Sequence, residues 1–412
     1  MSEAYIIDTC RTPRGIGKIG KGALADFHPQ HLAATVLRAL ADRNQLDTAE
    51  VDDVIWGTSM QRGKQGNDMA RMALLDAGYS HLASGVTLDR FCGSGITTVN
   101  LAAASVAAGF EDLVIAGGCE MMSYTLSLAD PAELPQMDAG NLRLRRNVPQ
   151  SHQGVCADAI ATLEGIPREA LDDLALLSQQ RAAAAIEGGH FDRSLVPVRR
   201  DDGSVALARE EFPRPQTTRE GLAALKPSFA TLAGVPLDAE GNTYAGYIRK
   251  AYPDLEIEHV HHAGNSSGVV DGAGALLLAS ADLVKKRGLK PRARVRAVAN
   301  VGDSPILMLN GPVPATRKVL AKAGLTVDDI DLFEINEAFA VVAEKYIRDL
   351  RLDRDKVNVN GGAMALGHPI GATGALLIGT LLDELERRDL KRGLVTMCAA
   401  GGMAPAIIIE RV

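Results

Sequence analysis

Residues 89–95, with the sequence DRFCGSG, join an apolar segment, GVTLDR (85–90), to a long alanine-rich run, ITTVNLAAASVAAGF (96–110). The first segment is typical of a β-strand and the second of a helix, so the pattern predicts a strand, a tight turn and a helix. Cys92 in this turn lies near the helix N-terminus, where the partial positive charge favours the thiolate, the nucleophilic form. A lone cysteine is more often a small buried apolar side chain, so its context has to decide.

The same arrangement occurs a second time in the chain. Residues 357–374, VNVNGGAMALGHPIGATG, precede another helical run and the apolar segment LVTMCAAGG (394–402). Likewise, residues 36–57, VLRALADRNQLDTAEVDDVIWG, resemble residues 319–336, VLAKAGLTVDDIDLFEIN. Strands that alternate with helices predict a layered α/β fold, and the repetition indicates a duplication whose two similar halves pack on each other.

Residues 123–269, between the two halves, have a different composition, with polar, charged and proline-containing stretches. Within them, Arg168 to Ile186 has apolar residues at helical spacing and Pro167 just before its start, which predicts a helix. The segment is too long for a structureless connector, so we expect an inserted loop domain. The expected domains are residues 1–122 with 270–291, the loop domain 123–269, and residues 292–412.

Composition excludes several classes of protein. With 46% apolar and 23% charged residues, the 412-residue chain has the balance of a soluble α/β enzyme. Its net charge of -7 argues against binding to a nucleic-acid backbone. The five cysteines are odd in number and widely spaced, which fits neither a disulfide framework nor a zinc ribbon. We therefore expect no metal site and no nucleic-acid partner.

The first residues, MSEAYIIDTCRTPRG, lack the basic region and long apolar run of a secretory leader. No apolar run approaches the roughly 20 residues that span a bilayer, and the last residues, IIIERV, are not a peroxisomal signal. We expect a cytoplasmic protein without membrane contact.

Three further residues are candidates for chemistry. His368 lies in the turn GHPIGATG (367–374), the counterpart of the Cys92 turn, so the duplication could bring a thiol and an imidazole together. Cys398 ends an apolar strand before a glycine turn, and a second thiol there could exchange protons with a carbon acid. Asn336 follows the apolar segment DLFEI and could donate to a carbonyl, although a helix cap is its commoner role.

Together the motifs DRFCGSG, NEAFA, GHPIGATG and TMCAAGGM, in this order and at these intervals, resemble the thiolase family from end to end. The resemblance implies a duplicated thiolase-like α/β fold, an acyl group carried on Cys92, and His368 as the base that deprotonates it. It implies that His368 and a water held by Asn336 form one oxyanion hole. The amides of Cys92 and Ala400 would form the second, and Cys398 would be the acid and base for the substrate α-carbon and for CoA.

The resemblance also implies residues that bind the substrate. The CoA-binding candidates are Arg214 for the nucleotide phosphates, Ala263 and Ser267 in a turn beside pantetheine, and His152. The candidates for the acyl pocket are Gln153, Met308, Leu309 and Phe339. Coenzyme A is thus expected as a substrate, with acyl-CoA, and no tightly bound cofactor is expected. The family also implies a homodimer or homotetramer.

Several positions depart from the family pattern. Ala400 occupies the first of three usual glycines, Gln153 replaces a common methionine, and Leu309 adds bulk where glycine is common. The stretch 231–262 is longer than in short-chain thiolases. It could form a lid, with Tyr244 and Tyr247, or cover the outer surface of the loop domain, which is the interpretation we favour. Within it, His259, His261 and His262 align with a strand, whose alternating faces do not suit a metal site.

Three functions remain open from the sequence. The favoured one is a thiolase, which cleaves 3-oxoacyl-CoA with CoA or runs the reverse Claisen condensation. A decarboxylating ketoacyl synthase would pair its cysteine with two histidines or with histidine and asparagine, so the Cys398 motif disfavours it. A non-catalytic acyl-CoA-binding relative would be expected to have lost the cysteines or His368.

Overall fold

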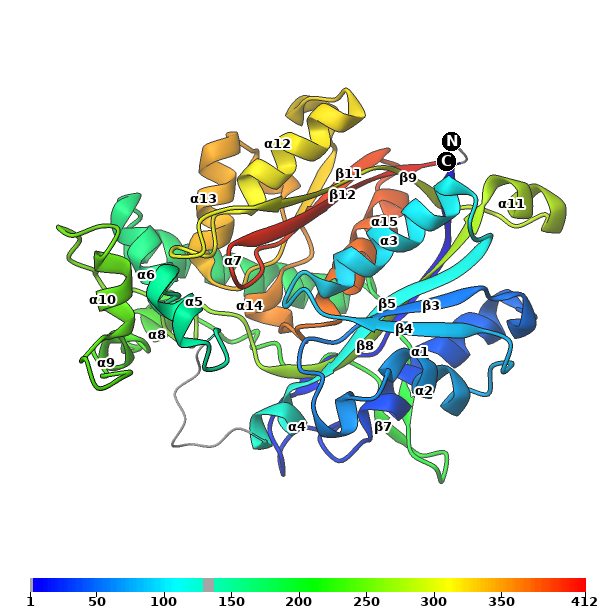
Figure 1. Ribbon diagram of the computed structural model, residues 1–412. Coiled ribbons are helices and arrows are strands. Elements are labelled where there is room, and N and C mark those ends of the chain that lie inside the picture. Colours follow the sequence, from blue (N-terminus) through cyan, green and yellow to red (C-terminus); the bar gives the residue numbers. More distant parts are fainter. Residues whose placement is uncertain (1–2, 129–136) are drawn as a thin grey trace.

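The computed structural model describes residues 3–128 and 137–412 (Figure 1). The first half of the chain alternates strands and helices as expected. Its elements are β1 (Ala4–Arg11), β2 (Gly15–Ile16), α1 (Pro29–Asn44), β3 (Asp53–Gly57), α2 (Met69–Asp76), β4 (Ser84–Leu88), α3 (Ser94–Ala108) and β5 (Leu113–Met121), completed by β8 (Val270–Ser280) and α11 (Ala281–Arg287).

The second half repeats this order without counterparts of β2 and β4. Its elements are β9 (Ala293–Gly302), α12 (Pro312–Ala323), β10 (Leu332–Ile335), α13 (Ala340–Leu350), α14 (Ala363–Leu366), α15 (Thr373–Arg387), β11 (Arg392–Thr396) and β12 (Met403–Arg411). Where the first half has β4 beside β3, the second half has a single parallel bridge between Phe333 and Val357. Short 3-10 turns lie at Thr48–Glu50, Gly63–Gln65, Val327–Asp329 and Arg354–Lys356.

The strands form one ten-stranded mixed sheet in the order β10-β11-β12-β9-β1-β8-β5-β3-β4, with β2 beside β8. The two halves join where β1 pairs antiparallel with β9, through Tyr5 and Ile6. The sheet folds around α3 and α15, so that these helices lie between the strands of the two halves (Figure 1). Helices α12 and α13 cover one outer face, and α1 and α2 cover the other (Figure 1).

Two aspartates, one in each half, make the same hydrogen bonds at equivalent places, which supports the duplication. Asp52 precedes β3, and its carboxylate accepts from the backbone N–H groups of Asp112 and Leu113 at the start of β5. Asp331 precedes β10, and its carboxylate accepts from the N–H groups of Lys391 and Arg392 at the start of β11. The same side chain thus joins equivalent parallel strands in each half.

Helices α3 and α15 meet through their glycines. A Cβ placed on Gly374 would lie 2.1 Å from the backbone nitrogen of Ile96, and one on Gly95 would lie 2.8 Å from that of Ala375. The N-terminal turns of both helices therefore touch backbone to backbone. Residues 91–108 are long and apolar enough to cross a membrane, but 67% of this window is buried in the protein, as in a core helix of a soluble protein.

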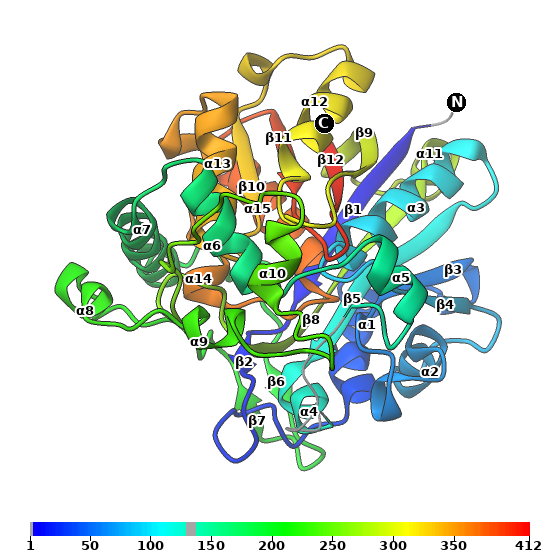
Figure 2. The same cartoon turned by 60° about the vertical axis from the view of Figure 1, so that its left-hand side comes forward.

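The inserted region forms a layer of short helices that comes forward in Figure 2. The predicted helix from Arg168 is confirmed as α7 (Arg168–Glu187). The other elements are α4 (Met122–Ser127), α5 (Leu142–Asn147), α6 (Gln153–Leu163), β6 (Val198–Arg199), β7 (Val205–Leu207), α8 (Arg219–Ala223), α9 (Ala230–Ala233) and α10 (Tyr244–Arg249).

Residues 231–262 pack onto the loop domain through a short helix. Helix α10, within this stretch, buries Tyr244, Tyr247 and Ile248. The carbonyl of Tyr244 accepts a hydrogen bond from the Ser151 hydroxyl, 2.9 Å away. The longer segment supplies aromatic side chains to the core of the loop domain because its helix has an apolar face that packs against α6 and α9.

We predict that Gly374→Ala destabilises the protein by about 1–3 kcal/mol or more, because the methyl group overlaps backbone that has no room to move. Urea unfolding followed by circular dichroism measures the loss. Gly302→Ala is the matched control, since a Cβ there meets nothing within 4 Å. Equal stability of the two variants would contradict the close contact of α3 and α15.

Candidate active site

The Cys92 turn is held in an unusual conformation. Phe91, just before the cysteine, has a left-handed backbone with φ of 49°, a region that costs a bulky residue energy. Ser94 supports this conformation, because its hydroxyl donates to the carbonyl of Phe91 and accepts from the N–H of Arg90. Gly93 follows as the N-cap of α3, with space for no side chain beside Pro405. The turn therefore presents Cys92 at the start of the helix.

The surroundings of the Cys92 thiol raise its pKa, against the expected effect of the helix N-terminus. Burial raises its pKa to about 12, and the negative charges of Glu120 and Asp89 act in the same direction. We expected the helix N-terminus to favour the thiolate, but the resting side chain is a neutral thiol. A base must therefore remove the proton when Cys92 reacts.

His368 is held as a neutral imidazole in a fixed orientation. It is buried, and burial together with the positive charge of Arg14 lowers its pKa to about 3, so the imidazole is neutral near pH 7. Its Nδ1 lies 2.6 Å from the hydroxyl of Thr373, which itself donates to the carbonyl of Pro369. Because the hydroxyl proton is used in this way, Nδ1–H donates to Thr373, and Nε2 is left free to accept a proton.

Asn336 is not a helix cap, since α13 begins at Ala340 with Phe339 as its N-cap. Its side chain is fully buried, and its Nδ2 lies 3.4 Å from Nε2 of His368. Its Oδ1 has no hydrogen-bond partner among the described residues. A buried acceptor without a partner commonly binds a water, which agrees with the water-holding role that the resemblance implies.

Cys398 lies at the turn between β11 and β12 and is buried. Burial raises its pKa, and a charge on Cys92 raises it further, so the two sulfurs interact electrostatically. Gly401 and Gly402 take left-handed conformations, with φ of 75° and 79°, whereas Ala400 does not. The methyl group of Ala400 is therefore tolerated. In the described chain, neither the Ala400 nor the Cys92 N–H donates to a backbone carbonyl, so both are available to an oxyanion.

The segment Ala263–Gly268 connects the site to the loop domain. The N–H of Ser267 donates to the carbonyl of Ala338, and Gly268 receives a hydrogen bond at its carbonyl from the N–H of His368, 2.9 Å away. Ser267 thus lies between the Asn336 segment and the His368 turn. Its role toward CoA stays a prediction.

Arg214 and Ala263 line the same cavity, of about 210 Å³, with Phe212, Thr218, Leu222 and Met364. The guanidinium of Arg214 is exposed and lies 5.4 Å from the centre of the Phe212 ring. The backbone N–H of Arg214 donates to Gln179 on α7, which fixes the segment. The structure therefore brings together two of the residues predicted to bind CoA, in a cavity that carries a free cation at its edge.

A row of rings links the loop domain to the strand end that carries Asn336. Tyr244 packs edge-on against His152, His152 against Phe229, and Phe229 against Phe339, with ring centres 5.5 to 5.8 Å apart. Burial lowers the pKa of His152 to about 4, so this ring is neutral. The predicted residues His152 and Phe339 therefore belong to one aromatic wall, together with Tyr244, which the sequence did not single out as a site residue.

The other acyl-pocket candidates are placed differently. Met308 is fully buried in a left-handed conformation with φ of 65°. Leu309 packs in a small hollow with Ile160, Val341 and Tyr346, between α6, α12 and α13. Gln153 is the first residue of α6 and is half-buried. Their contact with an acyl chain stays a prediction.

The three neighbouring histidines do not lie on a strand, which corrects our expectation for residues 259–262. His259 and His261 both contact the buried carboxylate of Asp158 through Nδ1, at 2.7 and 2.8 Å. His262 contacts Asp172 at 2.8 Å. These pairs fasten the chain before Ala263 to helices α6 and α7.

Two features of the site escaped prediction. Nothing in the motif GHPIGATG singled out Thr373, because its hydrogen bond to His368 depends on the geometry of the turn. Glu337, in NEAFA, accepts from Ser178, Asn358 and the N–H of Met364 and so holds the segment before His368. The position of Glu337 between two apolar segments could have indicated a structural role, because a buried carboxylate needs hydrogen-bond donors around it.

A thiol at a strained turn, a neutral imidazole and a second thiol define an enzyme that works through a cysteine nucleophile on a duplicated α/β scaffold. Two family models match the chain: the thiolase N-terminal domain over residues 4–236 and the thiolase C-terminal domain over residues 289–411. The chain belongs to the thiolase family. It is therefore an acyltransferase of a family that uses CoA substrates.

Named relatives and a solved structure agree with this assignment. The chain is 39% identical to an Escherichia coli acetyl-CoA acetyltransferase, with 100% of both chains covered. It is 41% identical to a Pseudomonas aeruginosa beta-ketoadipyl-CoA thiolase, covering 100% of this chain and 99% of the other. The crystal structure of the Bacillus anthracis acetyl-CoA acetyltransferase superposes with a TM-score of 0.84 at 35% identity, covering 100% and 99% of the chains.

We predict that Thr373→Val slows alkylation of Cys92 by iodoacetamide by at least about 10-fold at neutral pH, because His368 loses the acceptor that fixes its tautomer. Mass spectrometry of the Cys92 peptide over time gives the rate. Thr373→Ser keeps the hydroxyl and should react like the unchanged protein. A valine variant as fast as the serine variant would show that the contact does not orient the base.

Proposed function

We propose that this thiolase moves acyl groups between CoA thiols through an acyl-Cys92 intermediate, and that it breaks or forms the carbon-carbon bond of a 3-oxoacyl-CoA. The observation that supports this most is the backbone contact between the N-terminal turns of α3 and α15, which brings the turns of Cys92 and His368 to one place, with the second thiol, Cys398, in electrostatic range of Cys92. A protein that only binds acyl-CoA has no need of this set.

In the cleavage direction, Nε2 of His368 takes the proton of Cys92 as the sulfur attacks the ketone carbon. The oxyanion accepts hydrogen bonds from the groups that surround it, either the Cys92 and Ala400 amides or His368 with the water of Asn336. The carbon-carbon bond then breaks, and acetyl-CoA leaves as an enolate. The thiol of Cys398 protonates the enolate carbon and becomes a thiolate.

The second half of the reaction restores the enzyme. The Cys398 thiolate takes the proton of an incoming CoA thiol, whose sulfur attacks the acyl thioester on Cys92. Cys92 leaves as a thiolate and regains its proton from His368. Splitting the transfer into two steps is the gain that a covalent nucleophile provides, and it predicts ping-pong kinetics. The presence of Cys398 beside Cys92 supports this path over a decarboxylating synthase.

For substrate binding, we propose that the Arg214 cavity takes the nucleotide end of CoA and that the aromatic wall of His152, Phe229 and Phe339 follows the acyl and pantetheine chain. The exposed guanidinium suits a phosphate, and the rings offer an apolar surface to the chain. No tightly bound cofactor takes part in this scheme.

We predict that incubation with acetyl-CoA leaves an acetyl group on Cys92, seen as a modified peptide by mass spectrometry. Cys398→Ala should still form this adduct, while cleavage of acetoacetyl-CoA falls by about 10²–10⁴-fold, since only the later proton transfers need the second thiol. Cys119→Ala, a buried cysteine outside the site, is the control. Acetylation elsewhere than Cys92 would refute the mechanism, and equal loss of both steps would make Cys398 structural.

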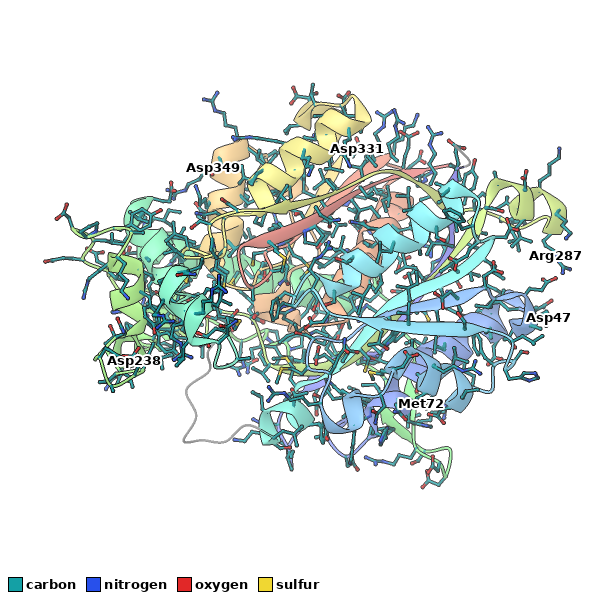
Figure 3. All side chains as sticks on the ribbon, viewed as in Figure 1. Asp47, Met72, Asp238, Arg287, Asp331 and Asp349 are labelled. Carbon is teal, nitrogen blue, oxygen red and sulfur yellow. The ribbon has the colours of Figure 1, made fainter. Side chains whose placement is uncertain are left out.

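We also propose that the chain forms at least a homodimer through the outer edge of β4. In the described structure this edge strand pairs only with β3, and Val86 on it is 45% exposed. Leu82 before the strand and Met72 on the neighbouring α2 are also exposed, and Met72 lies at the periphery in Figure 3. An apolar edge strand favours pairing with a second copy.

Light scattering at micromolar concentration should therefore give twice the chain mass or more. Val86→Lys places a charge on the edge and should shift the protein toward monomer. Val205→Lys, at an exposed valine of the separate hairpin β6–β7, should leave the mass unchanged. A monomeric unchanged protein would overturn the proposal.

A further inference from the structure

Glu120 is a fully buried carboxylate at the end of β5. Its Oε2 accepts from the backbone N–H groups of Ser59 and Gly371, both 2.9 Å away. Its Oε1 accepts from the N–H of Met60 at 3.2 Å and from the side-chain amide of Gln65 at 2.7 Å. One carboxylate therefore joins a loop of the first half to the turn of the second half that carries His368.

All four partners of Glu120 are donors. A proton on the carboxyl group would find no acceptor among them, so these bonds favour the charged form. Burial opposes them and raises the pKa of Glu120. The amide of Gln65 is itself fixed, because its oxygen accepts from the N–H of Met121. A negative charge on Glu120 is therefore stabilised by three backbone N–H groups and by an amide whose orientation is fixed.

The peptide of Gly371 is inserted between the ends of β3 and β5. A Cβ on Gly118 would lie 2.2 Å from the carbonyl oxygen of Gly371, and one on Gly57 would lie 2.7 Å from it. A Cβ on Gly371 itself would meet Thr58 and Glu120. Sterics thus leave Gly371 one position, and the hydrogen bond to Glu120 holds it there.

Gly371 lies in the same tight turn as His368. The N–H groups of Ala372 and Thr373 both donate to the carbonyl of Pro369. Thr373 in turn accepts from the imidazole of His368. A shift of Gly371 therefore moves the acceptor that orients the base.

We propose that Glu120 is a positioning residue: its carboxylate anchors the His368 turn onto the first half of the chain. The inference rests on the proposed function for its catalytic consequence. Glu120 and Asp89 are the carboxylates that act on the Cys92 thiol, and both disfavour the thiolate. A charge on Glu120 thus acts in the same direction as burial, which is the larger cause of the raised Cys92 pKa.

The test compares Glu120→Gln and Glu120→Asp with the unchanged enzyme. Glutamine removes the charge and turns an NH₂ group toward N–H donors, so kcat for acetoacetyl-CoA cleavage should fall by about 10- to 100-fold with KM for CoA unchanged. The pH profile of Cys92 alkylation by iodoacetamide should shift to lower pH. Aspartate keeps the charge but is too short to span the contacts, so kcat should fall while the alkylation profile stays in place.

Asp331→Asn is the matched control. Its carboxylate also accepts from two backbone N–H groups, and it lies far from the site, at the top of Figure 3. The Asp331→Asn variant should lose stability without a change in kcat or in the pH profile of Cys92 alkylation. The proposal is overturned if both Glu120 variants keep the kcat of the unchanged enzyme, as Asp331→Asn does. If Glu120→Gln does not fold, Glu120→Asp still decides the anchoring role through kcat. Alkylation needs no acyl-CoA, so absence of an acetyl adduct in the unchanged enzyme would count against the proposed function alone.

Discussion

The backbone contact between the N-terminal turns of α3 and α15 is the constraint on which the site depends. Gly95 and Gly374 let the two helices touch without side chains between them, so the turns that carry Cys92 and His368 are brought to one place. Any side chain there would separate the helices by about the width of a methyl group or more, and catalytic geometry tolerates shifts of only about 1 Å. The duplication therefore has a structural consequence for the site, because it makes two equivalent turns meet.

Burial at this contact has an electrostatic consequence. The packing that joins the halves buries Cys398 and His368 and leaves Cys92 partly exposed, and the pKa of each group is shifted toward its neutral form. A resting thiolate–imidazolium pair is thereby avoided. Charge develops only during attack, when the free amides of Cys92 and Ala400 can receive it, which is where preorganised donors contribute most.

The sequence predicted those parts of the structure that repeat or that alternate regularly. The layered α/β fold, helix α7 and the pairing of the Cys92 and His368 turns all followed from periodicity and duplication. The site contacts that it missed depend on residues far apart in the chain: Glu120 and Gly371 are brought together by the close packing of glycines, and Tyr244 meets His152 through the fold of the loop domain. The sequence left the role of residues 231–262 open, because a short helix with buried tyrosines has the same local composition as a surface loop.

The groups proposed to transfer protons and those proposed to contact the substrate chain come from different parts of the protein. The proton-transfer groups and their supports, such as Thr373 and Glu337, come from the duplicated halves apart from Ser178 on α7, whereas the aromatic wall takes His152, Phe229 and Tyr244 from the insertion. The two sets meet at Phe339, three residues after Asn336. The insertion contacts the catalytic segments through several groups, among them Ser178 with Glu337 and the Gly268 carbonyl with the N–H of His368, while its rings meet the second half at Phe339.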